Sequence, residues 1–151
     1  MLKKGTTAPQ FSLPDDAGNT VRLKDFRGEK VVLYFYPKDD TPGCTREACS
    51  FRNAFSKFKK SGIKVLGVSP DTEASHKKFA AKYKLPFTLL ADTDHSVAEA
   101  YGVYGQKKFM GRTYMGILRT TFLIDEKGKI RKVFEKVKPD EHADEVLKAF
   151  E

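Results

Sequence analysis

The pattern of apolar and polar residues predicts strands and helices in alternation. Residues 30–37, KVVLYFYP, form a continuous β-branched and aromatic run, as expected of a strand that is covered on both faces. Residues 63–69, IKVLGVS, predict a second buried strand, and residues 86–92, PFTLLAD, a shorter one. Between these strands we expect one helix from about 45 to 60, which ends at Ser-Gly, and another over 70–85.

Both ends of the chain add further elements to this core. Residues 11–26 predict an N-terminal β-hairpin around an Asp-Ala-Gly-Asn turn, and residues 119–135 predict two strands around Glu-Lys-Gly-Lys. A short helix is expected over 96–103, and a final helix from about 139. The apolar face of the final helix is formed by Ala143, Val146, Leu147 and Phe150. This order of elements favours an α/β fold, a three-layer sandwich with a mixed central sheet flanked by helices, in a single domain over 1–151. A thioredoxin-like fold has this arrangement, although periodicity alone does not single it out.

Composition and length indicate a folded globular protein. The chain has 151 residues, of which 40% are hydrophobic, with 12 Phe and 6 Tyr. No run approaches the ~20 apolar residues that span a bilayer, and the N-terminal MLKKGTTAPQF lacks the apolar centre of a signal peptide. We therefore expect a cytoplasmic protein without a membrane partner. In a reducing compartment its two cysteines are expected to be catalytic, redox-active or simply buried, and not a structural disulfide.

The net charge of +8 raises the alternative of a nucleic-acid-binding α/β domain. The lysines, however, are scattered and interleaved with Asp and Glu, which is typical of a solvated surface. A nucleic-acid site would also need a surface stripe of aromatic and basic residues, whereas the aromatic residues here mostly occupy expected core positions. We therefore expect no nucleic-acid partner.

The first cysteine begins an apolar stripe on the helix predicted over 45–60. The members of the stripe follow one another at intervals of four, three, four and three residues: Cys44, Ala48, Phe51, Phe55 and Phe58. One interpretation is therefore structural, because free cysteine is commonly a small buried apolar residue.

Three features favour a chemical role for Cys44. It lies in the first turn of the helix, where unpaired N–H groups and the positive end of the helix dipole favour a thiolate, the nucleophilic form of cysteine. Thr41 precedes it by three residues and offers a hydroxyl. Pro37 ends the buried strand and Pro42-Gly43 forms a turn, so the strand delivers Cys44 to an edge of the sheet where α/β folds place their chemistry.

The second cysteine, Cys49, lies five residues after Cys44. In a regular helix this spacing gives about 140° around the axis and a Cα separation of roughly 8–9 Å, beyond the ~7 Å limit for a disulfide. Either Cys49 is inert or the helix unwinds when the two sulfurs bond. A zinc site is disfavoured because His76, His95 and His142 show no ligand spacing with the cysteines or with each other, and the spacing excludes a CxxC motif.

Two segments resemble a known family. Residues 36–52, YPKDDTPGCTREACSFR, contain the Pro-x-x-x-Thr-x-x-Cys motif of peroxiredoxins and closely resemble the bacterioferritin comigratory protein, or peroxiredoxin Q, branch. Residues 111–130, GRTYMGILRTTFLIDEKGKI, resemble the second signature of the same family, and the resemblance runs from APQFSLPD at residue 8 to the final helix. It implies a thioredoxin-like fold and a monomeric thiol peroxidase for hydrogen peroxide and organic hydroperoxides, in antioxidant defence, with no cofactor or metal.

The resemblance also implies roles for both cysteines. Cys44 would be the peroxidatic cysteine, whose thiolate attacks the peroxide and becomes a sulfenic acid. Cys49 falls where many members of the branch carry the resolving cysteine, which would form an intramolecular disulfide with Cys44. Thioredoxin or a similar dithiol protein would then reduce this disulfide. A redox sensor or holdase with the same disulfide switch is the alternative, and only the catalytic rate separates the two.

Four further residues match positions of the family's active site. Thr41 would hydrogen-bond the peroxide and the sulfur, and Pro37 would shield the site from water. Arg119 matches the active-site arginine, and Glu47 the acid that orients it. A charged residue at the start of a buried strand needs a partner, and a fixed cation suits the negative charge that develops on the leaving oxygen. The sequence leaves open whether Tyr34, Phe109 and Met110 form a pocket wall or belong to the core.

Overall fold

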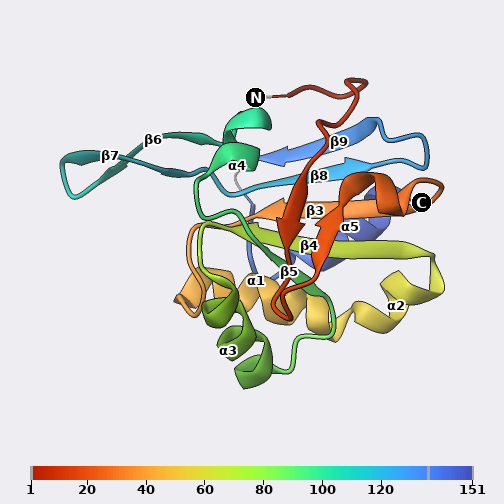
Figure 1. The fold of residues 1–151 in the computed structure, drawn as a ribbon, viewed down its shortest axis with the longest axis horizontal. Coiled ribbons are helices and arrows are strands. Elements are labelled where there is room, and N and C mark those ends of the chain that lie inside the picture. The colour runs from red at the N-terminus through yellow and green to blue at the C-terminus, as the bar shows by residue number, and fades with distance from the viewer. Residues whose placement is uncertain (1, 136, 151) are drawn as a thin grey trace.

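A five-stranded mixed sheet lies at the centre of the computed structural model, which describes residues 2–135 and 137–150 (Figure 1). In spatial order its strands are β5 (Thr88–Ala91), β4 (Ile63–Ser69), β3 (Lys30–Phe35), β8 (Thr120–Ile124) and β9 (Ile130–Glu135). The first three are parallel, whereas β8 is antiparallel to both of its neighbours. The expectation of an α/β fold with a mixed sheet is therefore confirmed.

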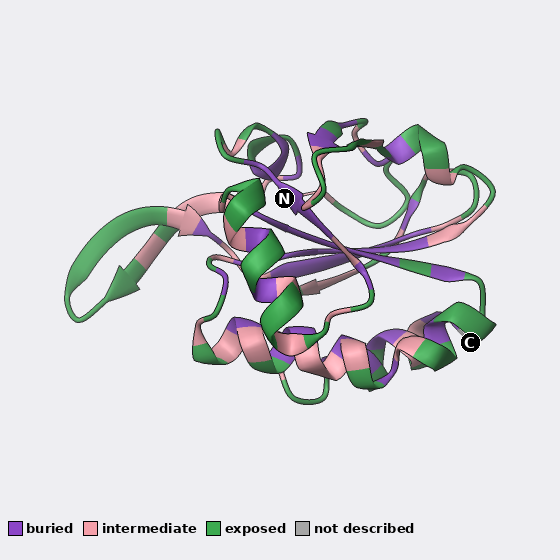
Figure 2. Cartoon of the chain, turned by 60° about the horizontal axis from the view of Figure 1, so that its bottom comes forward, coloured by how far each residue is buried: buried purple, intermediate pink, exposed green. Residues whose placement is uncertain are grey.

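Helices and the N-terminal segment cover the two faces of this sheet. One apolar cluster joins the sheet to α1 (Pro42–Asn53), α2 (Phe55–Lys60), α3 (Glu73–Tyr83) and α5 (His142–Phe150). A second cluster joins the opposite face to the N-terminal segment, the short 3-10 helix η1 (Leu23–Phe26) and α4 (Ser96–Ala100). Figure 2 shows that the helices turn their buried positions toward the sheet and their exposed positions outward. The sheet therefore lies between two covering layers, as the predicted three-layer sandwich requires.

The N-terminal hairpin forms as expected, with β1 (Ser12–Pro14) antiparallel to β2 (Thr20–Arg22) and Leu13 opposite Val21. The side chain of Thr72 caps α3 by accepting a hydrogen bond from the Ser75 amide at 3.1 Å. The helices of the described residues are all too short or too polar to cross a membrane.

The structure corrects three boundaries. The helix expected from 45 to 60 begins earlier, at Pro42, because a proline is favourable at the first helical position. It is also divided into α1 and α2 at Ala54, a break that nothing in the local sequence explains. The final helix begins at His142 instead of about residue 139.

A second hairpin is absent from the expectations. It consists of β6 (Tyr104–Phe109) and β7 (Arg112–Ile117), which pair only with each other among the described strands. It projects from the body of the molecule and is largely exposed (Figures 1 and 2). The turn at Met110-Gly111, where both residues have positive φ, joins its strands.

Candidate active site

The loop over residues 36–41 carries the chain from the end of β3 into α1. Thr41 is the N-cap residue of α1, but its hydroxyl donates a hydrogen bond to the Lys38 carbonyl at 2.9 Å and does not cap the helix. The N–H groups in the first turn of a helix have no acceptor within the helix. They therefore stay available to an anion at the position where Cys44 lies.

Cys44, Arg119 and Glu47 are in direct contact. The Cys44 side chain is buried, with 1% of the residue exposed, and Nη2 of Arg119 donates to its Sγ at 3.1 Å. Nη1 of the same guanidinium donates to Oε1 of Glu47 at 2.6 Å. Arg119 directly precedes β8, which pairs with β3, so the sheet brings it to the beginning of α1. The structure thus brings together three of the residues that the sequence predicted.

Burial and charge act in opposite directions on this cluster. Glu47 is fully buried, and burial raises its pKa to about 7, although Arg119 lowers it. Burial lowers the pKa of Arg119, but the charges of Glu47 and Cys44 more than offset this effect and raise it. Arg119 therefore stays a cation with one donor on a sulfur and one on a carboxylate. The second oxygen of Glu47, Oε2, is buried without a hydrogen-bond partner.

The other two predicted site residues, Pro37 and Cys49, lie near this cluster in the sequence but do not share the hydrogen bonds of Arg119. Pro37 is half-buried directly after Tyr36, at the end of the buried β3 segment. Cys49 is half-buried within α1, and both cysteines are free thiols. The helix between them is intact, as expected for a spacing that prevents the disulfide in a regular helix.

The three aromatic and methionine positions left open by the sequence separate into two groups. Tyr34 belongs to the core, where its ring stacks on Tyr36 and Phe51. The core alternative is wrong for Phe109 and Met110, which are 66% and 87% exposed at the tip of the β6–β7 hairpin. An isolated two-stranded arm has no second layer against which its tip could be buried.

A buried polar network beside the loop is absent from the sequence expectations. Asp39 contacts His76, Tyr36 and Ser75, and its backbone amide donates to Asp71. Oxygen and nitrogen atoms of Asp39, Asp71 and His76 lie within 4.8 Å of one another, a spacing that could hold a metal ion. The same atoms already form hydrogen bonds with protein groups, so the network is complete without one.

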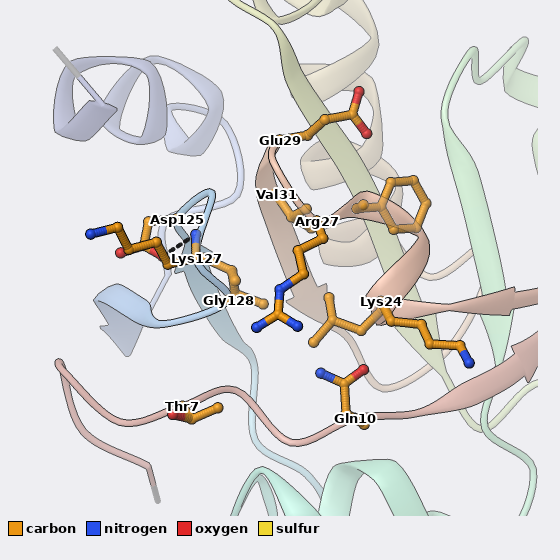
Figure 3. Close-up of a pocket in the computed structure, with 12 residues that line it drawn as sticks. Thr7, Gln10, Lys24, Arg27, Glu29, Val31, Asp125, Lys127 and Gly128 are labelled. Atoms are coloured by element: carbon orange, nitrogen blue, oxygen red, sulfur yellow. Dashed lines mark hydrogen bonds between the residues drawn. The ribbon is translucent and has the colours of Figure 1, made fainter.

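A small pocket lies at the opposite end of β3 from Cys44 (Figure 3). Its cavity volume is about 30 Å³, and Gln10, Lys24 and Arg27 surround it together with Asp125. None of the predicted site residues lines it. Its volume suits about one water molecule, so it does not compete with the cysteine cluster as a catalytic site.

Comparison with known proteins identifies the family. The model of the AhpC/TSA family matches residues 4–133. The chain belongs to the AhpC/TSA family. It is 53% identical to peroxiredoxin Bcp of Escherichia coli K12 over 146 residues, which cover 97% of this chain and 94% of that protein. It is 46% identical to the chloroplastic peroxiredoxin Q of Sedum lineare over 148 residues, which cover 97% and 77%.

Solved structures agree with this assignment. A cysteine-to-serine mutant of Xylella fastidiosa PrxQ is 34% identical and superposes with a TM-score of 0.94, covering 99% of this chain and 96% of that one. A peroxiredoxin Q mutant of Xanthomonas campestris is 40% identical with a TM-score of 0.88, covering 93% and 89%. The expected resemblance to the Bcp and peroxiredoxin Q branch is confirmed, as is the thioredoxin-like fold of this AhpC/TSA member. These relatives support a peroxidase.

Proposed function

We propose that this chain is a thiol peroxidase in which Cys44 reduces hydrogen peroxide and organic hydroperoxides. The contact of Arg119 with the Cys44 sulfur carries the proposal. A fixed cation and the first-turn amides of α1 favour a thiolate, and both lie where negative charge would develop on a leaving oxygen. An alkyl peroxide reduction activity is described for the bacterioferritin comigratory protein of Xanthomonas campestris, which supports the organic substrates.

The first step forms a sulfur–oxygen bond and breaks the oxygen–oxygen bond of the peroxide. The Cys44 thiolate attacks one peroxide oxygen, and the other leaves as hydroxide or alkoxide and takes up a proton. The sulfur is oxidised to a sulfenic acid, and the peroxide is reduced to water or, for an organic substrate, to an alcohol. Thr41 at the N-cap would bind the peroxide, and Pro37 would limit the access of water.

The second step joins Cys49 to Cys44. The Cys49 thiolate displaces the hydroxyl of the sulfenic acid, a disulfide forms, and water leaves after protonation. Because the intact helix keeps the two sulfurs apart, α1 must unwind locally for this step. Thioredoxin or a similar dithiol protein would then supply two electrons to restore both thiols. A cytoplasmic location and a monomeric state stay predictions.

A single-turnover reaction of the reduced protein with hydrogen peroxide tests this proposal. We expect the second-order rate constant to exceed that of free cysteine at the same pH by orders of magnitude, because the site stabilises the leaving oxygen. Intact mass should fall by two hydrogens, the signature of a disulfide. Cys44→Ser should abolish the fast reaction, and Cys49→Ser should keep it but stop at a sulfenic acid. A rate equal to that of free cysteine would reject the peroxidase and favour the redox sensor.

A further inference from the structure

The loop that precedes Cys44 is anchored by a buried carboxylate. Asp39 accepts hydrogen bonds from the Tyr36 hydroxyl at 2.6 Å and from the Ser75 hydroxyl at 2.8 Å. Nδ1 of His76 lies 2.7 Å from Oδ2 of the same carboxylate. Ser75 and His76 belong to α3, so this helix holds the loop through the Asp39 side chain.

The surroundings of His76 define its protonation. Its Nε2 lies 2.9 Å from the Leu90 carbonyl oxygen, which can only accept a hydrogen bond, so Nε2 carries a proton. Asp39 also accepts from two hydroxyl groups, and as a carboxylate it accepts the contact from Nδ1 of His76 at 2.7 Å. His76 is fully buried, and it forms a buried ion pair with Asp39. Loss of the Nδ1 donor would leave the buried Asp39 carboxylate without one of its hydrogen-bond partners.

Asp71 and the end of α3 also hold the loop over residues 36–41. The Asp39 amide donates to Oδ2 of Asp71 at 2.8 Å. Asp40 has a φ of +56°, a left-handed conformation that is unfavourable for a residue other than glycine. Its carboxylate binds Lys82 at 2.8 Å and the Tyr83 hydroxyl, both at the end of α3. A strained conformation of this kind persists only where the surrounding contacts define it.

We propose that His76 is a positioning residue for the reaction of Cys44 with peroxide. Through Asp39 it fixes residues 36–41, and with them Pro37, Thr41 and the first turn of α1. Small displacements of reacting groups are costly, since an error of about 1 Å can slow a reaction about a hundredfold. The inference rests on the proposed peroxidase function and adds to it a residue that does not touch the sulfur.

Two replacements of His76 separate its contact with Asp39 from its contact with the Leu90 carbonyl. In His76→Asn the amide nitrogen is attached to Cγ, as Nδ1 is, so it can still donate to Asp39. In His76→Gln the amide nitrogen lies one bond further out, as Nε2 does, so it can donate to the Leu90 carbonyl but not to Asp39. We expect His76→Gln to slow the oxidation of Cys44 about tenfold or more, and His76→Asn to recover most of the rate.

A double-mutant cycle and a stability control complete the experiment. Asp39→Asn should slow oxidation about as much as His76→Gln, and the double variant should be no slower, because both changes break one contact. Ile124→Ala, a buried change at the far end of β8, should lower the midpoint of urea unfolding without slowing oxidation of the folded protein. All rates are measured in one turnover at a temperature where circular dichroism shows each variant folded.

The outcomes distinguish this inference from the proposed function. A slow wild-type protein would reject the peroxidase itself. A fast wild type with His76→Gln equally fast would overturn the positioning role alone. Equal slowing in His76→Asn and His76→Gln, or slowing in Ile124→Ala as well, would assign the effect to packing and would also overturn it. Slowing confined to His76→Gln and Asp39→Asn, without additivity, supports it.

Discussion

The chain is held differently on the two sides of Cys44. Upstream, residues 36–41 are fixed by buried hydrogen bonds and an ion pair to α3. Downstream, α1 keeps the buried pair of Glu47 with Arg119, and its polar contacts with the C-terminal helix region are weaker: an ion pair of Arg46 with Asp140, both exposed, and a 3.2 Å bond from the Ala143 amide to Ser50 Oγ. Exposed pairs of this kind contribute little, about 0–1 kcal/mol.

This difference matches the two demands that the proposed reaction makes on one short segment. Reduction of the peroxide needs the first turn of α1 in a fixed place, because its donors must already point at the leaving oxygen. Formation of the disulfide needs the turns between Cys44 and Cys49 to open. Because α3 holds the loop, whereas Arg119 and the C-terminal region hold α1, the helix can open without disturbing Pro37 and Thr41.

The largest expected effect comes from Arg119→Lys. A lysine keeps the charge but cannot present two fixed donors to Cys44 and Glu47 at once. We expect oxidation of Cys44 to slow about a hundredfold, as for the loss of a donor to a developing oxyanion. The later disulfide step should not slow, because the loss of a donor to Glu47 weakens one contact of the part of α1 that must open. Quenched-flow mass analysis would separate the two steps.

Arg131→Lys provides the matched control, since Arg131 lies on β9 against the Phe150 ring and not at the site. Its oxidation rate should equal that of the wild type. If Arg119→Lys slowed both steps equally, the separation between the rigid and the opening part of the segment would be wrong.

A smaller effect, about fivefold to tenfold on oxidation, is expected for Glu47→Gln, which keeps a hydrogen-bond acceptor for Arg119 but removes the charge. The stability of this variant relative to the wild type should depend on pH, because only the wild type carries the Glu47 carboxyl. The pKa of Glu47 is raised from 4.5 to about 7, so between these values the unfolded chain loses a proton that the folded chain keeps. Wild-type stability is therefore lost across this window as pH rises, and the loss is complete above about pH 7.

Urea unfolding of both proteins at pH 4.5, 6 and 8 measures this effect. The stability of Glu47→Gln relative to the wild type should increase by on the order of 2 kcal/mol over this range. His142, whose pKa burial lowers to about 4, acts in the opposite direction as pH falls, but it is present in both proteins and cancels in the difference. A difference that does not change with pH would show that Glu47 is already ionised in the folded protein at pH 4.5.

The sequence predicted the central sheet well because its buried strands are continuous apolar runs, such as residues 30–37. The β6–β7 hairpin was missed for the converse reason. Its outer half lacks an apolar face because it carries the polar residues Lys107, Lys108, Arg112 and Thr113. No described layer of the fold packs against this half. Its remaining signal is the Met110-Gly111 turn between Phe109 and Tyr114, too short to indicate a strand pair by itself.

The sequence also predicted only some of the residues of the candidate site. Cys44 could be placed by its helix position, and Arg119 by its position before a buried strand together with the family motif. The ion pair of Asp39 and His76 could not be predicted, because the partners come from a loop and a helix that only the tertiary fold brings together. His76 stands three residues before Phe79 on the apolar face of α3, so helical periodicity could place it inside but could not supply its partner Asp39.

The smallest expected effect comes from Thr45→Ala, which strengthens the part of α1 that must open. The Thr45 hydroxyl is buried without a hydrogen-bond partner, and alanine has a higher helix propensity than threonine by up to about 0.7 kcal/mol. A gain of this size lowers the open population about threefold. Disulfide formation should slow by that factor, and more Cys44 should gain a second oxygen to become sulfinic acid at a given peroxide excess.

Intact mass after peroxide titration measures the sulfinic fraction, and Ser56→Ala is the matched control for Thr45→Ala. Ser56 is exposed on α2, so its replacement by alanine favours helix formation outside the segment between the cysteines. The control should show the wild-type sulfinic fraction. An increase in both variants would indicate a general effect of stability, and an increase in neither would mean that opening of α1 does not limit the disulfide step. An increase in Thr45→Ala alone would locate the limiting motion between Cys44 and Cys49, downstream of the loop that α3 holds.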